Sequence, residues 1–325
     1  MSTVTYLEAI VIGALQGVSE LFPVSSLGHS VLLPALVGGR WAADLDVTAR
    51  HSPYLAVLVA MHVATAVGML IYFRHDWARV ARGLFTSLRT RRIDRPDQRL
   101  AWLLVLATIP VGIVGLALAN LVQTVLGKPI PSAIFLALNG LVLFVVERTQ
   151  RGRTEPASAT TTTDSADTPG PSEQTLDFAA QPTMVLAIAD PAVAADRKLA
   201  RLSARDALMI GASQSLALLP GISRSGITIV TGLYRGLRHD LAARFAFLLS
   251  TPVILAAGAL KIPELFEPAN RPVLGPALVG SLLAGVAAYF STRFLTTYFE
   301  TRTLKPFAIY CAIVGLGSLA VFLIR

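Results

Sequence analysis

The sequence predicts an all-α polytopic membrane protein with an inverted-topology repeat, six transmembrane helices and two re-entrant helical hairpins. Hydrophobic residues make up 54% of the 325 residues and charged residues 15%, whereas a soluble domain carries about 25% charged residues. Six apolar segments approach the length of about 20 residues that a helix needs to cross a bilayer. Two further apolar stretches are each broken by a polar turn, and they resemble each other.

The six predicted spanning helices fall into two groups of three. They are Tyr54–Phe73, Leu100–Val122, Pro131–Val146, Leu241–Leu260, Val273–Tyr289 and Lys305–Leu323. The third is short and has an alternative start near Leu126. Cytoplasmic loops carry an excess of lysine and arginine, and arginines crowd residues 74–99 and follow the third span. Residues 74–99 and 148–205 are therefore predicted to be cytoplasmic.

Residues 148–205 divide the chain into two predicted repeats, 1–147 and 206–325. Thr154–Gln174 is rich in Thr, Ser, Ala, Pro and acidic residues. Such a segment cannot bury enough apolar surface to fold, so 148–205 is predicted to be a disordered cytoplasmic linker. Each repeat begins with a hairpin and continues with three spans. Because three is an odd number, the second repeat is predicted to be upside down relative to the first.

The two predicted hairpins, residues 1–37 and 206–236, each consist of two apolar runs joined by a turn with Pro, Ser and Gly. Runs of about ten to fifteen residues suit half a bilayer. Irregular backbone at membrane depth is tolerated only where it is buried in protein or lines a water-filled cavity. The inverted repeat brings one hairpin in from each side, so their tips are predicted to meet near the midplane.

The first hairpin carries a possible catalytic constellation. Gln16 and Glu20 are four residues apart and share a helix face, and Ser25, Ser26 and His29 follow in the turn and the next helix. A hydroxyl, an imidazole and a carboxylate so close can perform nucleophilic or acid–base work. The alternative is that the serines cap a half-helix and the histidine is a hydrogen-bonded core residue. The carboxylate favours function, because an ionisable side chain in a membrane segment is costly.

The second hairpin places an arginine in the turn Pro220–Gly226. Arg224 stays charged, so it needs an anionic partner. That partner is either Glu20, in a structural ion pair between the repeats, or a phosphate held bidentately at a helix N-terminus. Three hydroxyls would add donors to a phosphate: Ser223, Ser225 and Thr228. The residues alone leave both alternatives open.

The remaining polar residues in the spans, the single cysteine and the net charge do not indicate a further functional site. His62 and Asn139 lie within predicted spans, where interhelical hydrogen bonds are the commoner role of such residues. The single cysteine, Cys311, excludes a disulfide within the chain. The net charge is +8, but its arginines cluster beside the spans, so we expect the lipid bilayer as a partner and no nucleic acid.

The two hairpin motifs resemble the signatures of a known family. Residues 16–29, QGVSELFPVSSLGH, closely resemble the first signature of the bacterial undecaprenyl-diphosphate phosphatases of the bacitracin-resistance type. Residues 220–228, PGISRSGIT, resemble the second, PGxSRSxxT, and FAFLLSTP at 245–252 resembles the stretch that follows it. The resemblance covers nearly the whole chain apart from the linker.

This resemblance implies a hydrolase that removes the terminal phosphate from undecaprenyl diphosphate. The product, undecaprenyl phosphate, is the lipid carrier reused in cell-wall peptidoglycan synthesis, and the activity confers bacitracin resistance. The resemblance further implies a multi-pass protein of the bacterial cytoplasmic (inner) membrane with its active site open to the outer side. The sequence leaves the oligomeric state open, a homodimer included.

The resemblance also implies a role for individual residues. Ser26 matches the proposed nucleophile, His29 the histidine beside it, and Arg224 the phosphate clamp. Glu20 matches the second acidic position, linked to a divalent cation, Mg²⁺ or Ca²⁺. The first acidic position, commonly Glu, is Gln16 here, which can offer a metal an amide oxygen but no charge. Further candidate phosphate-binding residues are Ser223, Ser225, Thr228 and Ser25.

Two other functional classes share features with this sequence. An isoprenoid-phosphate transporter or flippase is the runner-up, because inverted repeats with broken helices are common in transporters. A second lipid-phosphatase family carries PSGH and SRx5HxxxD motifs. Val230 occupies the place of that family's histidine after Ser223 and Arg224, so this second family is excluded.

Overall fold

The computed structural model describes residues 4–48, 52–121, 126–151 and 190–324, and within these ranges all regular secondary structure is helical. This result confirms the predicted all-α class. The helices are α1 (Tyr6–Ser19), α2 (Ser26–Val37), α3 (Gly39–Asp44), α4 (Pro53–Tyr72), α5 (Arg74–Thr90), α6 (Pro96–Leu121), α7 (Pro129–Arg151), α8 (Pro191–Leu199), α9 (Ala204–Ser213), α10 (Arg224–Tyr234), α11 (His239–Leu265), α12 (Leu274–Thr301) and α13 (Lys305–Ile324). Two short 3₁₀ helices join them, η2 (Gln214–Leu218) and η3 (Pro268–Val273).

Six helices are long and apolar enough to cross a membrane: α4, α6, α7, α11, α12 and α13. Each overlaps one predicted span, so the six predicted spans are confirmed as candidates by length and composition. Except for α4, the helices are longer than the predicted apolar runs, and α12 continues from the predicted end at Tyr289 to Thr301. Hydropathy marks only the part of a helix that suits hydrocarbon, whereas backbone hydrogen bonding continues into polar sequence.

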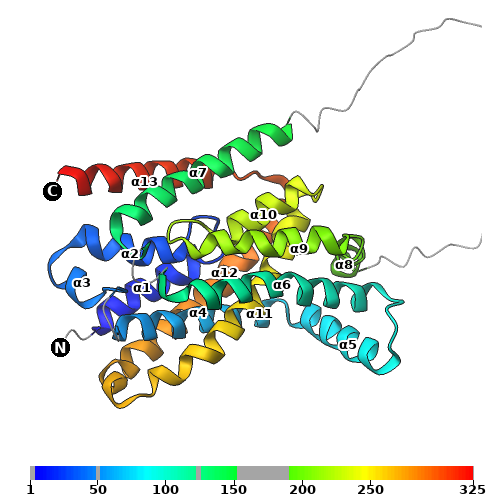
Figure 1. Ribbon diagram of the computed structural model, residues 1–325, viewed down its shortest axis with the longest axis horizontal. Coiled ribbons are helices and arrows are strands. Elements are labelled where there is room, and N and C mark those ends of the chain that lie inside the picture. Colours follow the sequence, from blue (N-terminus) through cyan, green and yellow to red (C-terminus); the bar gives the residue numbers. More distant parts are fainter. Residues whose placement is uncertain (1–3, 49–51, 122–125, 152–189, 325) are drawn as a thin grey trace, which may run out of the picture.

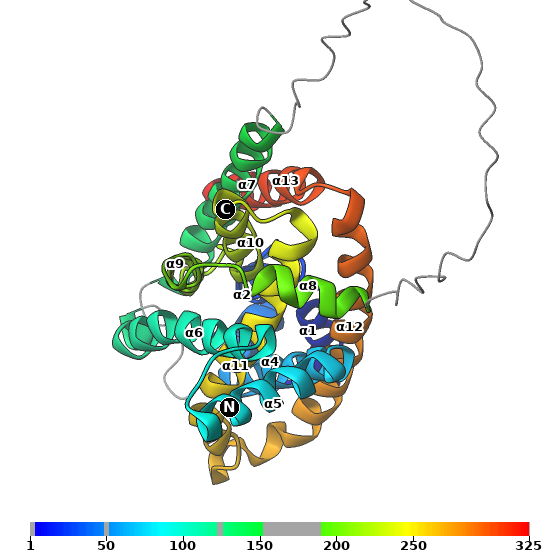
Figure 2. The same cartoon turned by 90° about the vertical axis from the view of Figure 1, so that its right-hand side faces the viewer.

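The long helices form an elongated bundle (Figure 1). The N- and C-terminal ends of the chain lie at one end of it, and α5 and α8 lie at the other (Figure 1). Helices α7 and α13 pack together along one side, and α4, α11 and α12 form the opposite side (Figures 1 and 2). The short helices α1, α2, α9 and α10 pack among these spans.

The region between the first two spans, 74–99, was predicted as a loop but contains the 17-residue helix α5. Residues 190–205, the described end of the predicted linker, contain α8; residues 152–189 lie outside the described part of the chain. Both helices are amphipathic and polar, so neither has the continuous apolar run by which spans were found.

A cluster of buried charges joins α8 to the bundle. Arg79 of α5 and Arg244 of α11 each pair with both Asp76 and Asp196, the latter from α8. Burial by itself would lower the pKa of the Arg79 guanidinium, but the hydrogen bonds and charges of Asp196 and Asp76 outweigh it and raise that pKa. This cluster holds the start of the second half of the chain against the first.

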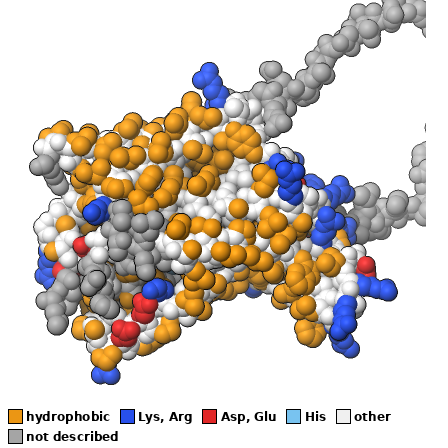
Figure 3. Space-filling view, in the orientation of Figure 1, with side chains coloured by type: hydrophobic (Ala, Val, Ile, Leu, Met, Phe, Trp, Pro, Cys, Tyr) orange, Lys and Arg blue, Asp and Glu red, His pale blue; other side chains and the backbone are white. Residues whose placement is uncertain are grey.

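The outer surface is apolar along the spans. Hydrophobic side chains cover the middle of the face in Figure 3, whereas lysine and arginine side chains gather at the end that carries α5. Leu116, Leu278 and Ile313, from three different spans, are each at least 64% exposed. A band of exposed leucine and isoleucine is the surface expected of helices that face lipid.

Candidate active site

Two polar turns meet inside the bundle. Ser25 caps the N-terminus of α2, and its Oγ accepts hydrogen bonds from the backbone N–H groups of Gly28 at 3.3 Å and Gly221 at 3.1 Å. Gly221 has a φ of 113°, and a Cβ there would lie 2.4 Å from the carbonyl oxygen of Ser132. Only glycine allows this conformation and this approach.

Asn139 of α7 ties the same two turns together. Its Nδ2 donates to the carbonyl of Pro23 at 3.0 Å, and its Oδ1 accepts from the backbone N–H of Ser223 at 3.0 Å. Asn139 is 2% exposed. Nδ2 of Asn139 also donates to Sγ of Cys311 in α13 at 3.3 Å, which confirms the expected interhelical hydrogen bond. The bonds to Pro23 and Ser223 hold the two turns in register.

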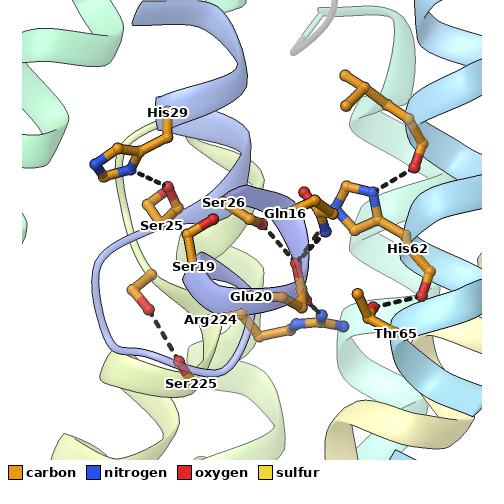
Figure 4. Close-up of polar contacts among 12 residues, drawn as sticks. Gln16, Ser19, Glu20, Ser25, Ser26, His29, His62, Thr65, Arg224 and Ser225 are labelled. Atoms are coloured by element: carbon orange, nitrogen blue, oxygen red, sulfur yellow. Dashed lines mark hydrogen bonds and ion pairs between the residues drawn. The ribbon is translucent and has the colours of Figure 1, made fainter. Parts of the chain in front are cut away.

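The carboxylate of Glu20 is the centre of the polar contacts (Figure 4). Its Oε1 forms an ion pair with the guanidinium of Arg224. Its Oε2 accepts hydrogen bonds from Gln16 Nε2 at 2.9 Å and from Ser26 Oγ at 2.5 Å. Nε2 of His62 lies 3.3 Å from the same oxygen. The structure therefore brings together the predicted site residues Gln16, Glu20, Ser26 and Arg224. It adds His62, for which only an interhelical hydrogen bond was expected.

His62 lies closer to the predicted site than its position in the sequence indicated. We expected an ordinary interhelical hydrogen bond, but its imidazole faces Glu20 and lines the cavity described below. Its Nδ1 lies 2.8 Å from the carbonyl oxygen of Leu58, four residues earlier in α4. The signal in the sequence was the presence of a titratable group inside a span, but no motif connected it to Glu20.

The predicted residue His29 lies apart from this cluster. Its Nδ1 is 2.7 Å from the carbonyl oxygen of Ser25, and its Nε2 is 2.8 Å from the hydroxyl of Tyr310 in α13. The imidazole also stacks on the Tyr310 ring, with ring centroids 5.6 Å apart. In this arrangement both ring nitrogens are engaged, and the imidazole points away from Ser26 and Glu20 (Figure 4).

The remaining predicted phosphate contacts surround Arg224. Ser223 caps α10, and its Oγ accepts from the backbone N–H of Gly226 at 3.1 Å. The hydroxyl of Ser225 donates to the carbonyl of Phe22 at 3.3 Å, and that of Thr228 to the carbonyl of Arg224 at 2.7 Å. These hydroxyls hold the turn in shape.

A cavity of about 340 Å³ opens beside Glu20 and Arg224. Its polar lining consists of Ser19, Glu20, Ser25, Ser26, His62, Gln214, Ser223, Arg224 and Lys261. Ser19, Gln214 and Lys261 were not predicted. Gln214 is 1% exposed, and neither its Oε1 nor its Nε2 has a hydrogen-bond partner among the described residues. A buried amide without partners is costly, so Gln214 is a candidate contact for a polar ligand.

An apolar groove of about 430 Å³ adjoins this cavity. Leu55, Val111 and Val253, from α4, α6 and α11, line both spaces. Lys261 also lines both. A ligand with an anionic head and a long apolar tail matches a polar cavity that continues into such a groove.

The residues around Glu20 fit a divalent cation. Among the described residues no three His, Cys, Asp or Glu side chains form a metal-binding group. However, Oε1 of Gln16 is buried and has no hydrogen-bond partner in the described part of the chain. An amide oxygen and a carboxylate are ligands for Mg²⁺ or Ca²⁺, and Mg²⁺ in particular takes further ligands from phosphates and water.

The site combines an arginine, a carboxylate and hydroxyls in a cavity that continues into an apolar groove, within a bundle of candidate spanning helices. These features define a membrane protein that binds amphiphilic anions. Within that class the family is shown by sequence comparison. The family model described as bacitracin resistance protein BacA matches residues 9–168 and 178–317. The chain belongs to this family.

Similar curated proteins cover nearly the same length. An undecaprenyl-diphosphatase of Mycolicibacterium paratuberculosis is 55% identical over 321 residues, which are 99% of this chain and 98% of that protein. Undecaprenyl-diphosphatase 1 of Frankia casuarinae is 50% identical and covers 97% of both chains. Undecaprenyl-diphosphatase 2 of Burkholderia thailandensis is 38% identical, covering 97% of this chain and 96% of its own length.

Proposed function

We propose that this protein hydrolyses undecaprenyl diphosphate to undecaprenyl phosphate and inorganic phosphate, and so recycles the lipid carrier of cell-wall synthesis. The observation that carries the proposal is the cluster of Glu20, Arg224 and Ser26 in a cavity that continues into an apolar groove. The names of the relatives, matched over nearly their whole length, support hydrolysis and favour it over transport.

Ser26 is suited to attack the terminal phosphorus. Its hydroxyl donates to Oε2 of Glu20, so the carboxylate can accept the proton as the Oγ–P bond forms and the P–O–P bond to the leaving monophosphate breaks. Water would then release phosphate from the serine. In the alternative, a water molecule replaces the Ser26 hydroxyl as nucleophile, and Glu20 orients it.

Arg224 is suited to hold the diphosphate. Its guanidinium lines the cavity and neutralises Glu20 across 204 positions of sequence. Guanidinium groups bind phosphate oxygens bidentately, so an incoming diphosphate would compete with Glu20 for N–H donors. Lys261 lines the same cavity and adds positive charge. Fixed positive charge at the phosphoryl group is the main contribution expected of a protein to such a reaction.

The proposal includes a divalent cation, Mg²⁺ or Ca²⁺. Glu20 and the unpartnered Oε1 of Gln16 would hold it, and bound there it would neutralise charge on the diphosphate oxygens. The missing second carboxylate lowers the negative charge of the site by one compared with a Glu–Glu pair. The affinity for the cation is accordingly expected to be lower than in relatives that have two carboxylates.

The re-entrant hairpins and the inverted repeat also belong to the proposal. Helices α1, α2, α9 and α10 have 14, 12, 10 and 11 residues, which is too short for a hydrocarbon core of about 30 Å. In addition, α1 crosses α12 where Gly13 meets Gly280, and α9 crosses α6 where Gly211 meets Ala107. An inverted repeat pairs α1 with α9 and α6 with α12, so each crossing is the counterpart of the other.

The active site is proposed to open to the outer side of the inner membrane. Arginine-rich α5 is assigned to the cytoplasm by its charge, so α4 begins outside at Pro53. Leu55, near this start, and Lys261, near the far end of α11, both line the cavity and groove. The mouth therefore lies toward the end of the spans opposite α5.

The test is phosphate release from undecaprenyl diphosphate by the purified protein, with and without a chelator. We expect release that the chelator abolishes and that Ser26→Ala reduces strongly. A preparation that moves the lipid between leaflets of a vesicle but releases no phosphate would establish the transporter instead.

A further inference from the structure

His62 is the one histidine in the described part of the chain that lines the cavity. Its Nδ1 is 2.8 Å from the carbonyl oxygen of Leu58. A carbonyl oxygen only accepts, so Nδ1 is the protonated nitrogen, and the neutral imidazole presents an unprotonated Nε2 to the other side. That Nε2 lies 3.3 Å from Oε2 of Glu20.

Two lone-pair atoms at this distance repel each other unless a positive charge lies between them. A second proton on the imidazole is one such charge, and a metal ion is another. Oε2 of Glu20 already accepts two hydrogen bonds, from Gln16 and Ser26, which fills its two lone-pair sites. Either positive charge therefore needs one of these two donors to move away, and the amide of Gln16 decides between the two.

Gln16 provides an independent observation at the same place. It is fully buried, and its Oε1 has no hydrogen-bond partner among the described residues. Its Nε2 is bonded to Oε2 of Glu20, so a half-turn of the amide brings Oε1 to the carboxylate instead. A cation satisfies that oxygen, the carboxylate and the imidazole nitrogen together.

We propose that Nε2 of His62 is the third protein ligand of the cation held by Glu20 and Gln16. The inference rests on the cation of the proposed function and extends its ligand set from oxygen alone to oxygen and nitrogen. Imidazole suits transition ions such as Zn²⁺ and Fe²⁺, whereas carboxylate and amide oxygens suit Mg²⁺, Ca²⁺ and Mn²⁺. A set of two oxygens and one nitrogen is consequently biased from Mg²⁺ and Ca²⁺ toward divalent transition ions, and among these Mn²⁺ also suits the two oxygens.

Electron spin echo spectroscopy of Mn²⁺ bound to the purified full-length protein tests the ligand directly. Spectra are compared for protein with ordinary histidine and protein with isotopically labelled imidazole nitrogens. We expect a nitrogen coupling that changes with the label. The variant His62→Gln should abolish the coupling and weaken Mn²⁺ binding by at least about tenfold, the lower end of what the loss of a supporting partner costs, with a smaller effect on Ca²⁺ binding.

The matched control is His239→Gln. His239 lies 2.9 Å from Glu147 and not in the cavity, so its replacement should leave the coupling unchanged. Bound Mn²⁺ without coupling to a histidine nitrogen, a coupling that persists in His62→Gln, or no binding of Mn²⁺ would each overturn the inference. Thermal unfolding in detergent checks the fold, and His62→Asn replaces the glutamine variant if that variant unfolds.

Phosphate release measured on the same preparations keeps the two proposals apart. Release without nitrogen coupling would remove His62 from the ligand set and leave the phosphatase in place. Nitrogen coupling without release would retain the metal site and reject the phosphatase.

Discussion

The buried carboxylate of Glu20 sets the chemistry at the scale of single residues. An isolated ionised carboxylate is very costly in a low-dielectric interior, and here Arg224, Gln16 and Ser26 each satisfy part of it. The two readings left open by the sequence, an ion pair and a phosphate site, therefore involve the same atoms. The ion pair is present in the structure, and an incoming phosphate would have to compete with it.

Variants of Arg224 and Glu20 separate the contribution of their ion pair to stability from its contribution to phosphate release. Arg224→Ala leaves a buried unpaired carboxylate and should destabilise the protein by about 3–5 kcal/mol. Adding Glu20→Gln should restore thermal stability in detergent but not phosphate release, because both phosphate-handling groups are then lost. Arg224→Lys keeps the charge without the bidentate fork, so it should fold and remain slow. Recovery of activity in the double variant would show that Arg224 serves only to neutralise Glu20.

Gln16→Glu should strengthen the dependence on divalent cation. The new carboxylate lies one turn from Glu20, where two negative charges repel each other until a cation binds. We expect a lower metal concentration at half-maximal phosphate release and a larger increase in thermal stability when metal is added. The same half-maximal concentration as in the parent protein would mean that Gln16 does not face the metal.

At the scale of helices, close crossings place the short helices among the spans. A Cβ at Gly211 would lie 2.0 Å from the carbonyl oxygen of Ala107, and one at Gly13 would lie 2.3 Å from that of Gly280. Small residues that let backbones approach are the usual means of packing helices where lipid removes the hydrophobic driving force. These crossings position α1 and α9, and through them the two turns that form the site.

Gly211→Ala tests the crossing of α9 with α6. The added methyl group meets backbone, which cannot rotate away, so the helices must separate and stability should fall by roughly 1–3 kcal/mol. The control is Gly317→Ala in α13, where no atom lies within 4 Å of the added Cβ. Alanine there should be neutral or slightly stabilising, because it is the better helix former. Equal thermal stabilities for the two variants would contradict this packing argument.

At the scale of the whole molecule, the six candidate spans carry the chain across the membrane an even number of times. Helices α5 and α8 lie at one end of the bundle and the two termini at the other (Figure 1). The arginine-rich end is assigned to the cytoplasm by its charge. This proposed orientation predicts that the start of α1, the end of α13 and the mouth of the cavity lie on the outer side.

Cysteine labelling from outside intact cells tests this orientation. In a Cys311→Ser background, Thr163→Cys in the predicted linker should resist a membrane-impermeant reagent. Glu267→Cys, between α11 and α12, is the matched control and should react, because Glu267 is exposed and is assigned to the outer side. Labelling at Thr163 with none at Glu267 would invert the topology and place the cavity mouth in the cytoplasm.

Local features of the sequence are enough to predict the membrane class, the six spans and the two polar motifs. Hydropathy is a local and additive property, so a run of apolar residues between Pro53 and Tyr72 identifies a span whatever it packs against. Residue chemistry also selected Glu20 and Arg224, because charge inside a membrane segment needs an explanation. The polar helices α5 and α8 escaped this reasoning, since a moderate amphipathic pattern is stabilised only by packing.

Which side chains meet depends on the packing of the helices. Glu20 and Arg224 are far apart in sequence, and their contact depends on the hydrogen bonds of Asn139 and Ser25 that join the two turns. The direction in which a side chain leaves its helix determines the other contacts. Nε2 of His62 points at Glu20, whereas His29, although it lies inside the motif, points at Tyr310. Direction around a helix axis changes by about 100° per residue, so proximity along the chain does not establish which face a side chain shares.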